Sequence, residues 1–215
     1  MGRRRERIRP TRAQTSERIL EGAAASFAER GFHGATIDDI ASRAGLTRGA
    51  FHSSFESKED LFLALYDHMS ARLRDRLSAA LAQVTLANGS LEAALRDFYQ
   101  GQLERDWYLL STEFNLYAVR QPLVARRLAT HHRALREALI SIVEEFLARH
   151  GRRLTADRDK VSRLLLAIHE GNQVQSLMEP DTLDAGDLTA TFAGAIMHSV
   201  SAEDAPATPS RIGTD

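Results

Sequence analysis

Apolar residues recur at intervals of three and four positions along most of the chain, the spacing that places them on one face of an α-helix. No segment alternates apolar and polar residues with the period of two expected of a half-buried strand. The pattern therefore predicts an all-α protein of about nine helices. The expected ranges are 16–30, 37–44, a short helix that starts after 47, then 58–82, 90–105, 107–120, 123–149, 155 or 157 to 178, and 184–200.

The first helix is expected to begin at a cap formed by Thr15 or Ser16 and to end at Gly31, where glycine suits the C′ position. One face of this helix is apolar and predicts contact with a core. That face contains Ile19, Leu20, Ala23, Ala24 and Phe27.

Residues 36–58 predict two short helices joined by a tight turn. Thr36 is an N-cap with Asp39 three positions later, which is a capping-box pattern. Gly45 can adopt a positive φ and end this helix, and Thr47 can cap the next one at once. Two helices joined so closely must cross steeply, as they do in a helix-turn-helix.

The second helix of this pair has two different faces. Ala50, Phe51 and Phe55 are expected to face the core. The opposite face is small and polar, as a helix that enters a DNA major groove about 12 Å wide would need. It carries Arg48, Gly49, His52 and Ser53.

Charge is distributed unevenly along the chain. The formal net charge is −1, but residues 1–12 hold six arginines and one glutamate, so the remaining residues together carry −6. A basic arm on a mildly acidic body fits contact with nucleic acid, and it also fits a disordered, solubilising end. We expect residues 1–14 to be a flexible arm and the proline-containing residues 201–215 to be a disordered tail.

Composition excludes several classes of function. The chain has no cysteine, which rules out disulfide scaffolds, thiolate metal sites and cysteine nucleophiles. No stretch approaches the roughly 20 apolar residues that span a bilayer, so we expect a cytoplasmic protein without membrane association. His169-Glu170 begins like a metalloprotease helix, but Gln173 stands where the second histidine is needed. We therefore expect no enzyme activity, no metal and no cofactor.

Small, capping and apolar residues stand in a characteristic register over the first 65 or so residues. The segments concerned are Ala28–Phe32, Ala35–Ile37, Ile40-Ala41, Ala44–Ala50, Phe55 and Ser57–Leu61. In these segments the chain resembles the DNA-binding domain of TetR-type (tetracycline-repressor-like) transcriptional regulators. The resemblance implies a helix-turn-helix domain over residues 15–60, followed over residues 61–200 by a helical domain that binds an effector and dimerises. The sequence departs from the family pattern at His52, where tyrosine is common, and at Ser54, where histidine is common.

The resemblance, together with the chemistry of DNA, predicts roles for individual residues. Arg48 is expected to read guanine, while Gly49 permits close approach and Ser53 adds a base or sugar contact. Thr36, His52 and Lys58 are expected to contact phosphates, since helix N-termini and cations attract anions. The remaining predicted DNA contacts are Thr47 and, in the arm, Arg5 and Arg7, for which a minor-groove contact and an ordinary mobile tail are equally open.

The larger domain is expected to hold a small-molecule effector of unknown identity and to form a homodimer on a quasi-palindromic operator. For the aromatic members of the predicted pocket, an ordinary core role is the alternative. The expected pocket residues are Trp107, Glu113, Phe114, Tyr117, Asn172 and Gln173, and the expected interface residues are Val161, Leu165, Ile168, Phe192, Ala195 and Ile196.

The sequence thus favours a ligand-responsive DNA-binding transcriptional regulator, most simply a repressor. The alternative is a helical protein that carries or sequesters a small molecule and whose N-terminal module is vestigial. Steep salt dependence of binding to a defined promoter would distinguish the first from the second.

Overall fold

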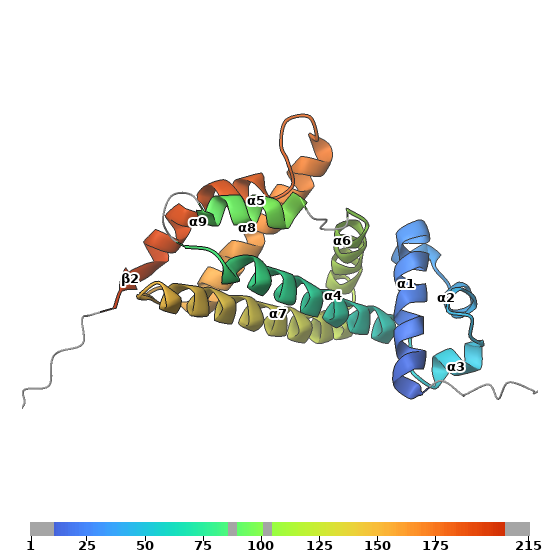
Figure 1. Ribbon diagram of the computed structural model, residues 1–215. Helices are drawn as coiled ribbons and strands as arrows, with labels where there is room; N and C mark the ends of the chain where they lie inside the picture. The colour runs from blue at the N-terminus through green and yellow to red at the C-terminus, as the bar shows by residue number, and fades with distance from the viewer. Residues whose placement is uncertain (1–10, 86–89, 101–104, 205–215) are drawn as a thin grey trace, which may run out of the picture. The chain divides into compact units, whose positions relative to one another are not determined.

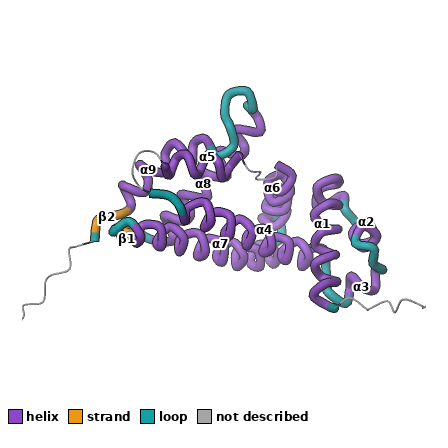
Figure 2. Tube along the Cα trace, in the orientation of Figure 1, coloured by secondary structure: helices purple, strands orange, loops and turns teal. Residues whose placement is uncertain are grey.

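The computed structural model describes residues 11–85, 90–100 and 105–204, and within these ranges it is almost entirely helical (Figures 1 and 2). This confirms the predicted all-α class and, for the described residues, the expected number of helices. None of these helices is both long enough and apolar enough to cross a membrane. The elements in chain order are α1 (Arg12–Gly34), α2 (Ile37–Arg43), α3 (Arg48–His52), α4 (Lys58–Ala82), α5 (Ser90–Gln100), α6 (Arg105–Val119), α7 (Pro122–Arg149), β1 (Arg152–Leu154), α8 (Arg158–Met178), α9 (Asp187–Val200) and β2 (Ser201–Glu203).

The chain forms two compact units. Unit 1 contains Met1–Leu73 and Leu103–Arg133, and unit 2 contains Arg74–Gln102 and Ala134–Asp215. The predicted boundary at residue 60 does not coincide with this grouping, because the long helices α4 and α7 each contribute to both units. As a result, α6 belongs to the same unit as the predicted helix-turn-helix.

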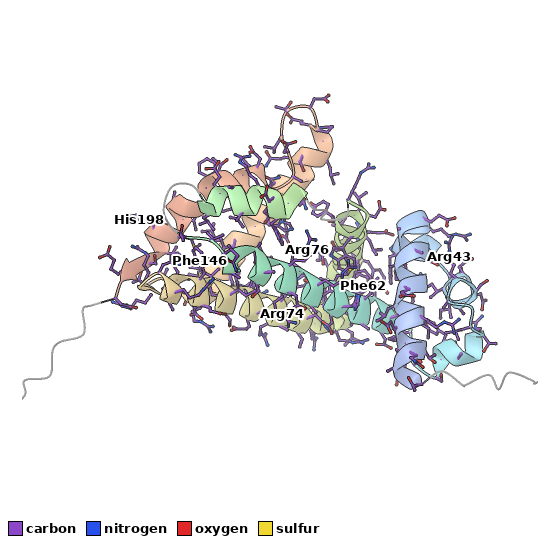
Figure 3. The ribbon with its side chains drawn as sticks, in the orientation of Figure 1. Arg43, Phe62, Arg74, Arg76, Phe146 and His198 are labelled. Carbon is purple, nitrogen blue, oxygen red and sulfur yellow. The ribbon has the colours of Figure 1, made fainter. Side chains whose placement is uncertain are left out.

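Unit 1 has an aromatic core that joins α1, α4 and α6. The rings of Phe62 and Phe114 stack with their centroids 3.7 Å apart, and Phe32 meets Phe114 edge to face at 4.8 Å. All three side chains are essentially inaccessible to solvent. Phe62, labelled in Figure 3, projects from α4. Aromatic side chains of this kind supply much of the buried apolar area of a small core.

Helix α1 packs closely on α2. Ile19, Ala23 and Phe27 are buried as predicted, whereas Ala24 is exposed. At Gly22 an added Cβ would lie only 2.9 Å from the carbonyl oxygen of Ile40, so the two helices approach each other where α1 has no side chain. Figure 1 shows α2 and α3 together on one side of α1.

Helix α1 begins earlier than the predicted caps at Thr15 or Ser16. Thr11 is the N-cap: its hydroxyl accepts from the Gln14 N–H at 3.3 Å, and the Gln14 side chain accepts from the Thr11 N–H at 2.9 Å. The Thr-x-x-Gln capping box is the local signal for this earlier start. The predicted arm therefore overlaps α1 at residues 12–14, while residues 1–10 lie outside the described ranges.

The predicted end of α1 at Gly31 corresponds to a kink. Gly31 has φ +68° and ψ 175°, and the chain resumes helical geometry as far as Gly34. This combination of angles is open essentially only to glycine.

Unit 2 is built around an apolar core to which α4, α5, α7, α8 and α9 contribute. Asn172 of α8 is completely buried. Its Nδ2 donates to the Asp184 carbonyl at 3.0 Å, and its Oδ1 accepts from the Leu188 N–H at 2.7 Å. A buried amide with both ends bonded fixes the entry into α9, which begins at Asp187 rather than at the predicted residue 184. The largest core side chains include Leu91, Leu95, Ile140, Phe146, Leu147, Val161 and Met197.

Two short strands correct the prediction that no strand occurs and that residues from 201 onward are disordered. β1 and β2 pair antiparallel, with Arg152 opposite Glu203 and Leu154 opposite Ser201. The Arg152 guanidinium also donates to the Ser201 hydroxyl at 2.9 Å and to its carbonyl at 3.0 Å. A three-residue strand is too short to show a period of two, so the sequence pattern could not predict it. The rest of the predicted tail, from residue 205, lies outside the described ranges.

We predict that Gly186→Ala destabilises unit 2 by about 2–4 kcal/mol. Gly186 has φ +77°, and a Cβ added there would lie 2.0 Å from Cγ of Tyr99. Gly194→Ala in α9 is the control, because its Cβ would meet no atom within 4 Å. It should change stability by less than about 1 kcal/mol. Urea unfolding followed by circular dichroism measures the free energy of unfolding of both variants. Equal destabilisation by the two substitutions would contradict the prediction.

Candidate nucleic-acid interface

The first helix of the predicted pair is fixed by its capping box. The Thr36 hydroxyl accepts from the Asp39 N–H at 3.1 Å, and the Asp39 carboxylate accepts from the Thr36 N–H at 3.1 Å and from the Thr36 hydroxyl at 2.6 Å. These hydrogen bonds from Thr36 hold the pKa of the Asp39 carboxyl below its ordinary value. The capping pattern that the sequence predicted is therefore confirmed.

The turn between α2 and α3 is fixed from several sides. Gly45 has φ +64°, and the Leu46 N–H donates to the Ala41 carbonyl at 2.8 Å, so the chain reverses at the predicted glycine. Arg18 of α1 donates to the Ala44 carbonyl at 2.6 Å and so satisfies a carbonyl at the end of α2. The angle between α2 and α3 is thus set by hydrogen bonds as well as by packing.

Helix α3 is only five residues long and depends on its cap and one buried side chain. The Thr47 hydroxyl accepts from the Ala50 N–H at 3.2 Å, and Phe51 is fully buried. On its outer side the structure brings together all four of the residues expected to face DNA, each of them exposed. They are Arg48, Gly49, His52 and Ser53.

Arg48 has a partner that sequence reasoning missed. Its Nη1 lies 3.0 Å from Oδ2 of Asp38 on α2, and the two side chains are 63% and 65% exposed. An ion pair this exposed contributes little, about 0–1 kcal/mol. The guanidinium can therefore exchange Asp38 for an acceptor on DNA at small cost.

The structure argues against the predicted phosphate contact by Lys58. The Lys58 Nζ donates to the carbonyls of Phe32 at 2.6 Å and Ala35 at 3.0 Å, and it lies 4.6 Å from the centre of the Phe32 ring. Burial lowers the pKa of this ammonium group, while the nearby Glu59 and Glu113 carboxylates oppose that shift. The carbonyls that follow the kink in α1 attract this cation inward, and no local sequence pattern shows their position.

Three other side chains affect the predicted contacts with DNA. The hydroxyl of Ser54, one of the departures from the family pattern, is buried and has no hydrogen-bond partner in the described part of the chain. Asp38 and Asp39 place two carboxylates in the first turn of α2. They compete with a phosphate for the N-terminus of that helix, so the phosphate contact of Thr36 stays a prediction.

The residues predicted to bind an effector are divided between the two units. Trp107, Glu113, Phe114 and Tyr117 lie on α6 in unit 1, whereas Asn172 and Gln173 lie on α8 in unit 2.

The α6 residues are engaged within unit 1. Trp107 stacks on Phe62 at 5.8 Å, and Phe114 belongs to the buried core. The Tyr117 hydroxyl donates to Glu59 at 2.8 Å, and Glu113 accepts two backbone N–H groups of unit 1. These side chains have protein partners, so their predicted role in an effector pocket has no support in the contacts.

Unit 2 contains a cleft that the sequence did not predict. Its volume is about 320 Å³, and apolar side chains line it between charged and polar ones. None of the predicted effector residues lies in its wall. The lining residues are Leu91, Glu92, Leu147, Arg152, Ala190, Thr191, Gly194, Met197 and His198.

The predicted dimer residues fall into three groups by burial. Val161 is 3% exposed and packs in the core of its own unit, which corrects its assignment to an interface. Phe192 and Ala195 are exposed, while Leu165, Ile168 and Ile196 are half-buried. The predicted interface residues did not include three exposed apolar side chains of α8, although the apolar residues on more than one face of this helix were a signal for a second partner. They are Leu164, Val174 and Met178.

Comparison with known protein families finds two matches along the chain. Residues 19–65 match the N-terminal model of the family described as bacterial regulatory proteins, tetR family. Residues 87–200 match the model described as the C-terminal domain of BetI-type transcriptional repressors. The first segment contains the whole of α2 and α3, and the second contains most of unit 2.

Individual proteins show the same relationship. The chain is 34% identical over 124 residues to the HTH-type transcriptional repressor AcnR of Corynebacterium diphtheriae, a match that covers 58% of this chain and only 60% of the repressor.

Among solved structures, a transcriptional regulator from Saccharomonospora viridis in complex with choline is similar in fold. Its TM-score is 0.63 at 21% identity, covering 89% of this chain and all of that one. The regulator FadR of Bacillus subtilis in complex with stearoyl-CoA gives a TM-score of 0.53 at 17% identity, covering 85% and 95%.

We predict that the stability provided by Asp39 depends on pH. Because its folded-state pKa lies below the ordinary 3.8, the ionised carboxylate stabilises the fold above that value, and this contribution is lost as the pH falls through the folded-state pKa. The difference in melting temperature between wild type and Asp39→Asn should be largest above about pH 5 and should shrink toward pH 2. Thr36→Val should weaken the pH dependence, because it removes the hydroxyl that lowers the pKa. A difference that is constant with pH would refute this role.

Proposed function

Because this chain belongs to the tetR family of bacterial regulatory proteins, we propose that it is a sequence-specific DNA-binding transcriptional regulator. We propose further that it is a repressor, as the name of its AcnR relative suggests, and that a small-molecule effector releases it from DNA in the cytoplasm. The observation that carries the proposal is the outer face of α3, where four residues suited to a major groove are exposed together.

The local structure supports a rigid reading surface. Hydrogen bonds at Thr36, Gly45 and Thr47 fix α2 and α3, and burial of Phe51 fixes the rotation of α3 about its axis. Small or polar side chains on the outer face allow the helix to enter the groove without steric conflict. Specific recognition needs such pre-organisation, because a loosely held helix would lose entropy on binding.

Arg48 is the strongest candidate for base recognition. A guanidinium can donate to O6 and N7 of guanine at once, which discriminates against other bases by about 1–3 kcal/mol. Gly49, beside it, permits close approach of the backbone. We propose that His52 and Thr47 contact phosphates and that Ser53 contacts a base or sugar. Arg5 and Arg7, outside the described residues, are proposed to reach the adjacent minor groove.

We propose that two copies act together through α8 and α9. Phe192, Met178, Leu164 and Val174 expose between 38% and 77% of their surface on two helices that pack together, as the members of an apolar interaction surface do. Burying them against a second copy removes this area from water. A two-fold dimer also presents two α3 helices, which matches a quasi-palindromic operator with half-sites about one helical turn apart.

The effector is proposed only as a small molecule. Choline and stearoyl-CoA, bound by the two similar structures, differ greatly in size and charge, so the shared fold does not determine ligand chemistry. Release from DNA requires that the effector bind one conformation of the dimer more tightly than the other.

We predict that Arg48→Ala lowers affinity for the operator, selected from a random DNA pool, by about 1–3 kcal/mol more than it lowers affinity for unrelated DNA. The matched control is Arg153→Ala, because the Arg153 side chain is 64% exposed, nearly the same as Arg48, but lies on β1 of unit 2. Fluorescence anisotropy titrations at several salt concentrations measure the affinity of each variant for the operator and for unrelated DNA. Equal losses on both DNAs would rule out base reading, and weak binding that ignores sequence in the wild type would favour a small-molecule carrier instead.

We predict that Phe192→Asp shifts the protein from dimer to monomer, because a carboxylate would be buried without a partner at the proposed interface. Leu116→Asp on α6 is the control, since Leu116 is 57% exposed and Phe192 is 53% exposed. Sedimentation velocity over a range of concentrations reports the oligomeric state. The proposed interface would be contradicted if Leu116→Asp also dissociated the dimer, or if the wild type were monomeric at all concentrations.

A further inference from the structure

We propose that Glu113 of α6 is a positioning residue, whose carboxylate holds the turn between α1 and α2 and thereby sets the position of α2 and α3 within unit 1. The proposal rests on the proposed DNA-binding function. In this proposal α6 binds directly, through Glu113, to the backbone segment that leads into the helix-turn-helix.

Both carboxylate oxygens of Glu113 accept backbone N–H groups from the kinked end of α1. The Phe32 N–H donates to Oε2 at 2.9 Å, and the His33 N–H donates to Oε1 at 3.1 Å. These partners lie about 80 residues away in sequence. The kink at Gly31 removes them from the regular hydrogen bonding of a straight helix, and hydrogen bonds to a charged acceptor are the stronger kind.

The backbone at this point is shaped to admit the carboxylate. Gly31 has φ +68°, and an added Cβ would lie 2.6 Å from Oε2 of Glu113. Any other residue would meet both backbone strain and the carboxylate itself. The glycine that marks the end of the first helix in the sequence therefore has a second role, which is to leave room for a side chain of α6.

The same turn is held from its other side by α4. Lys58 donates to the carbonyls of Phe32 and Ala35, while Glu113 accepts the N–H of Phe32. The peptide groups of the turn thus lie between an anion and a cation, each aligned with the end of the peptide dipole that it attracts. Two charged side chains from separate helices therefore hold the turn, Glu113 at its N–H groups and Lys58 at its carbonyls.

Tyr117, one helical turn after Glu113 on α6, contacts the same turn. Residues four apart lie on the same face of a helix, so Tyr117 faces the turn together with Glu113. Its ring lies 5.2 Å from Phe32 and 5.3 Å from His33, and its hydroxyl donates to Glu59 at 2.8 Å. Helix α6 therefore contacts the turn through a carboxylate and an aromatic ring.

The turn leads directly to Thr36, the N-cap of α2. A shift of α6 must either carry residues 32–36 along or break the two hydrogen bonds to Glu113. In the first case α2 and α3 move with the turn, and in the second the turn keeps only its contacts with Lys58 and the aromatic core. Trp107, the only tryptophan in the chain, lies on the same helix and stacks on Phe62, so its emission reports on α6.

The test compares Glu113→Ala, Glu113→Gln and a control, Glu145→Ala, which removes an exposed glutamate from α7 in unit 2. Amide hydrogen exchange is measured in full-length protein over residues 31–36 and 37–52, and binding is measured on the selected operator and on unrelated DNA. Glu113→Ala should speed exchange in both segments roughly tenfold and weaken operator binding by a similar factor. Glu113→Gln should recover part of each effect, because its amide oxygen still accepts one N–H.

Two outcomes would overturn the proposal. One is unchanged exchange over residues 31–36, and the other is faster exchange there with exchange over 37–52 and operator binding both unchanged. Trp107 emission shows whether each variant is folded, and if Glu113→Ala is not, the isosteric Glu113→Gln decides. Should the wild type select no operator, the proposed function fails, and exchange over 37–52 alone decides the role of Glu113.

Discussion

The packing of Phe32 and Phe62 against Phe114 is the interaction on which unit 1 depends. These rings come from the end of α1, from α4 and from α6, and they bury the apolar surface that joins the three helices. Once this core has formed, the turn at Gly31–Ala35 lies between Glu113 on one side and Lys58 on the other. The polar contacts are therefore a consequence of the aromatic packing, which excludes water and brings charged groups to the backbone.

This dependence explains how helices of seven and five residues can present a defined surface. Isolated helices of that length are not stable in water. In this protein α2 and α3 are held by side-chain caps, by Arg18 at the intervening turn and by burial of Ile40 and Phe51. The outer face of α3 therefore contributes little to the stability of the helix. Its polar residues are available for recognition because the caps, Arg18 and the buried side chains stabilise α2 and α3.

Unit 2 leaves apolar side chains of α8 and α9 exposed outside its core. Its core buries the amide of Asn172 with both ends hydrogen-bonded, yet Phe192 and Met178 stay exposed. Apolar side chains that a unit does not bury in its own core are what an interface requires. Residues of α8 therefore divide between a core role, as for Val161, and a surface role, as for Leu164. This division, rather than apolar character alone, distinguishes the proposed interface.

The sequence by itself determined the helices, the caps at Thr36 and Thr47, the turn at Gly45 and the exposed face of α3, because each depends on residues within a few positions of one another. The tertiary structure decided the contacts of Lys58 and Glu113, the burial of Val161 and of the Ser54 hydroxyl, and the pairing of β1 with β2. Most of these depend on partners tens of residues away, and the approach of one helix to another leaves no periodic pattern in the sequence. A side chain's type therefore indicated what Glu113 and Lys58 could bind, and only the packing of α1, α4 and α6 determined what they do bind.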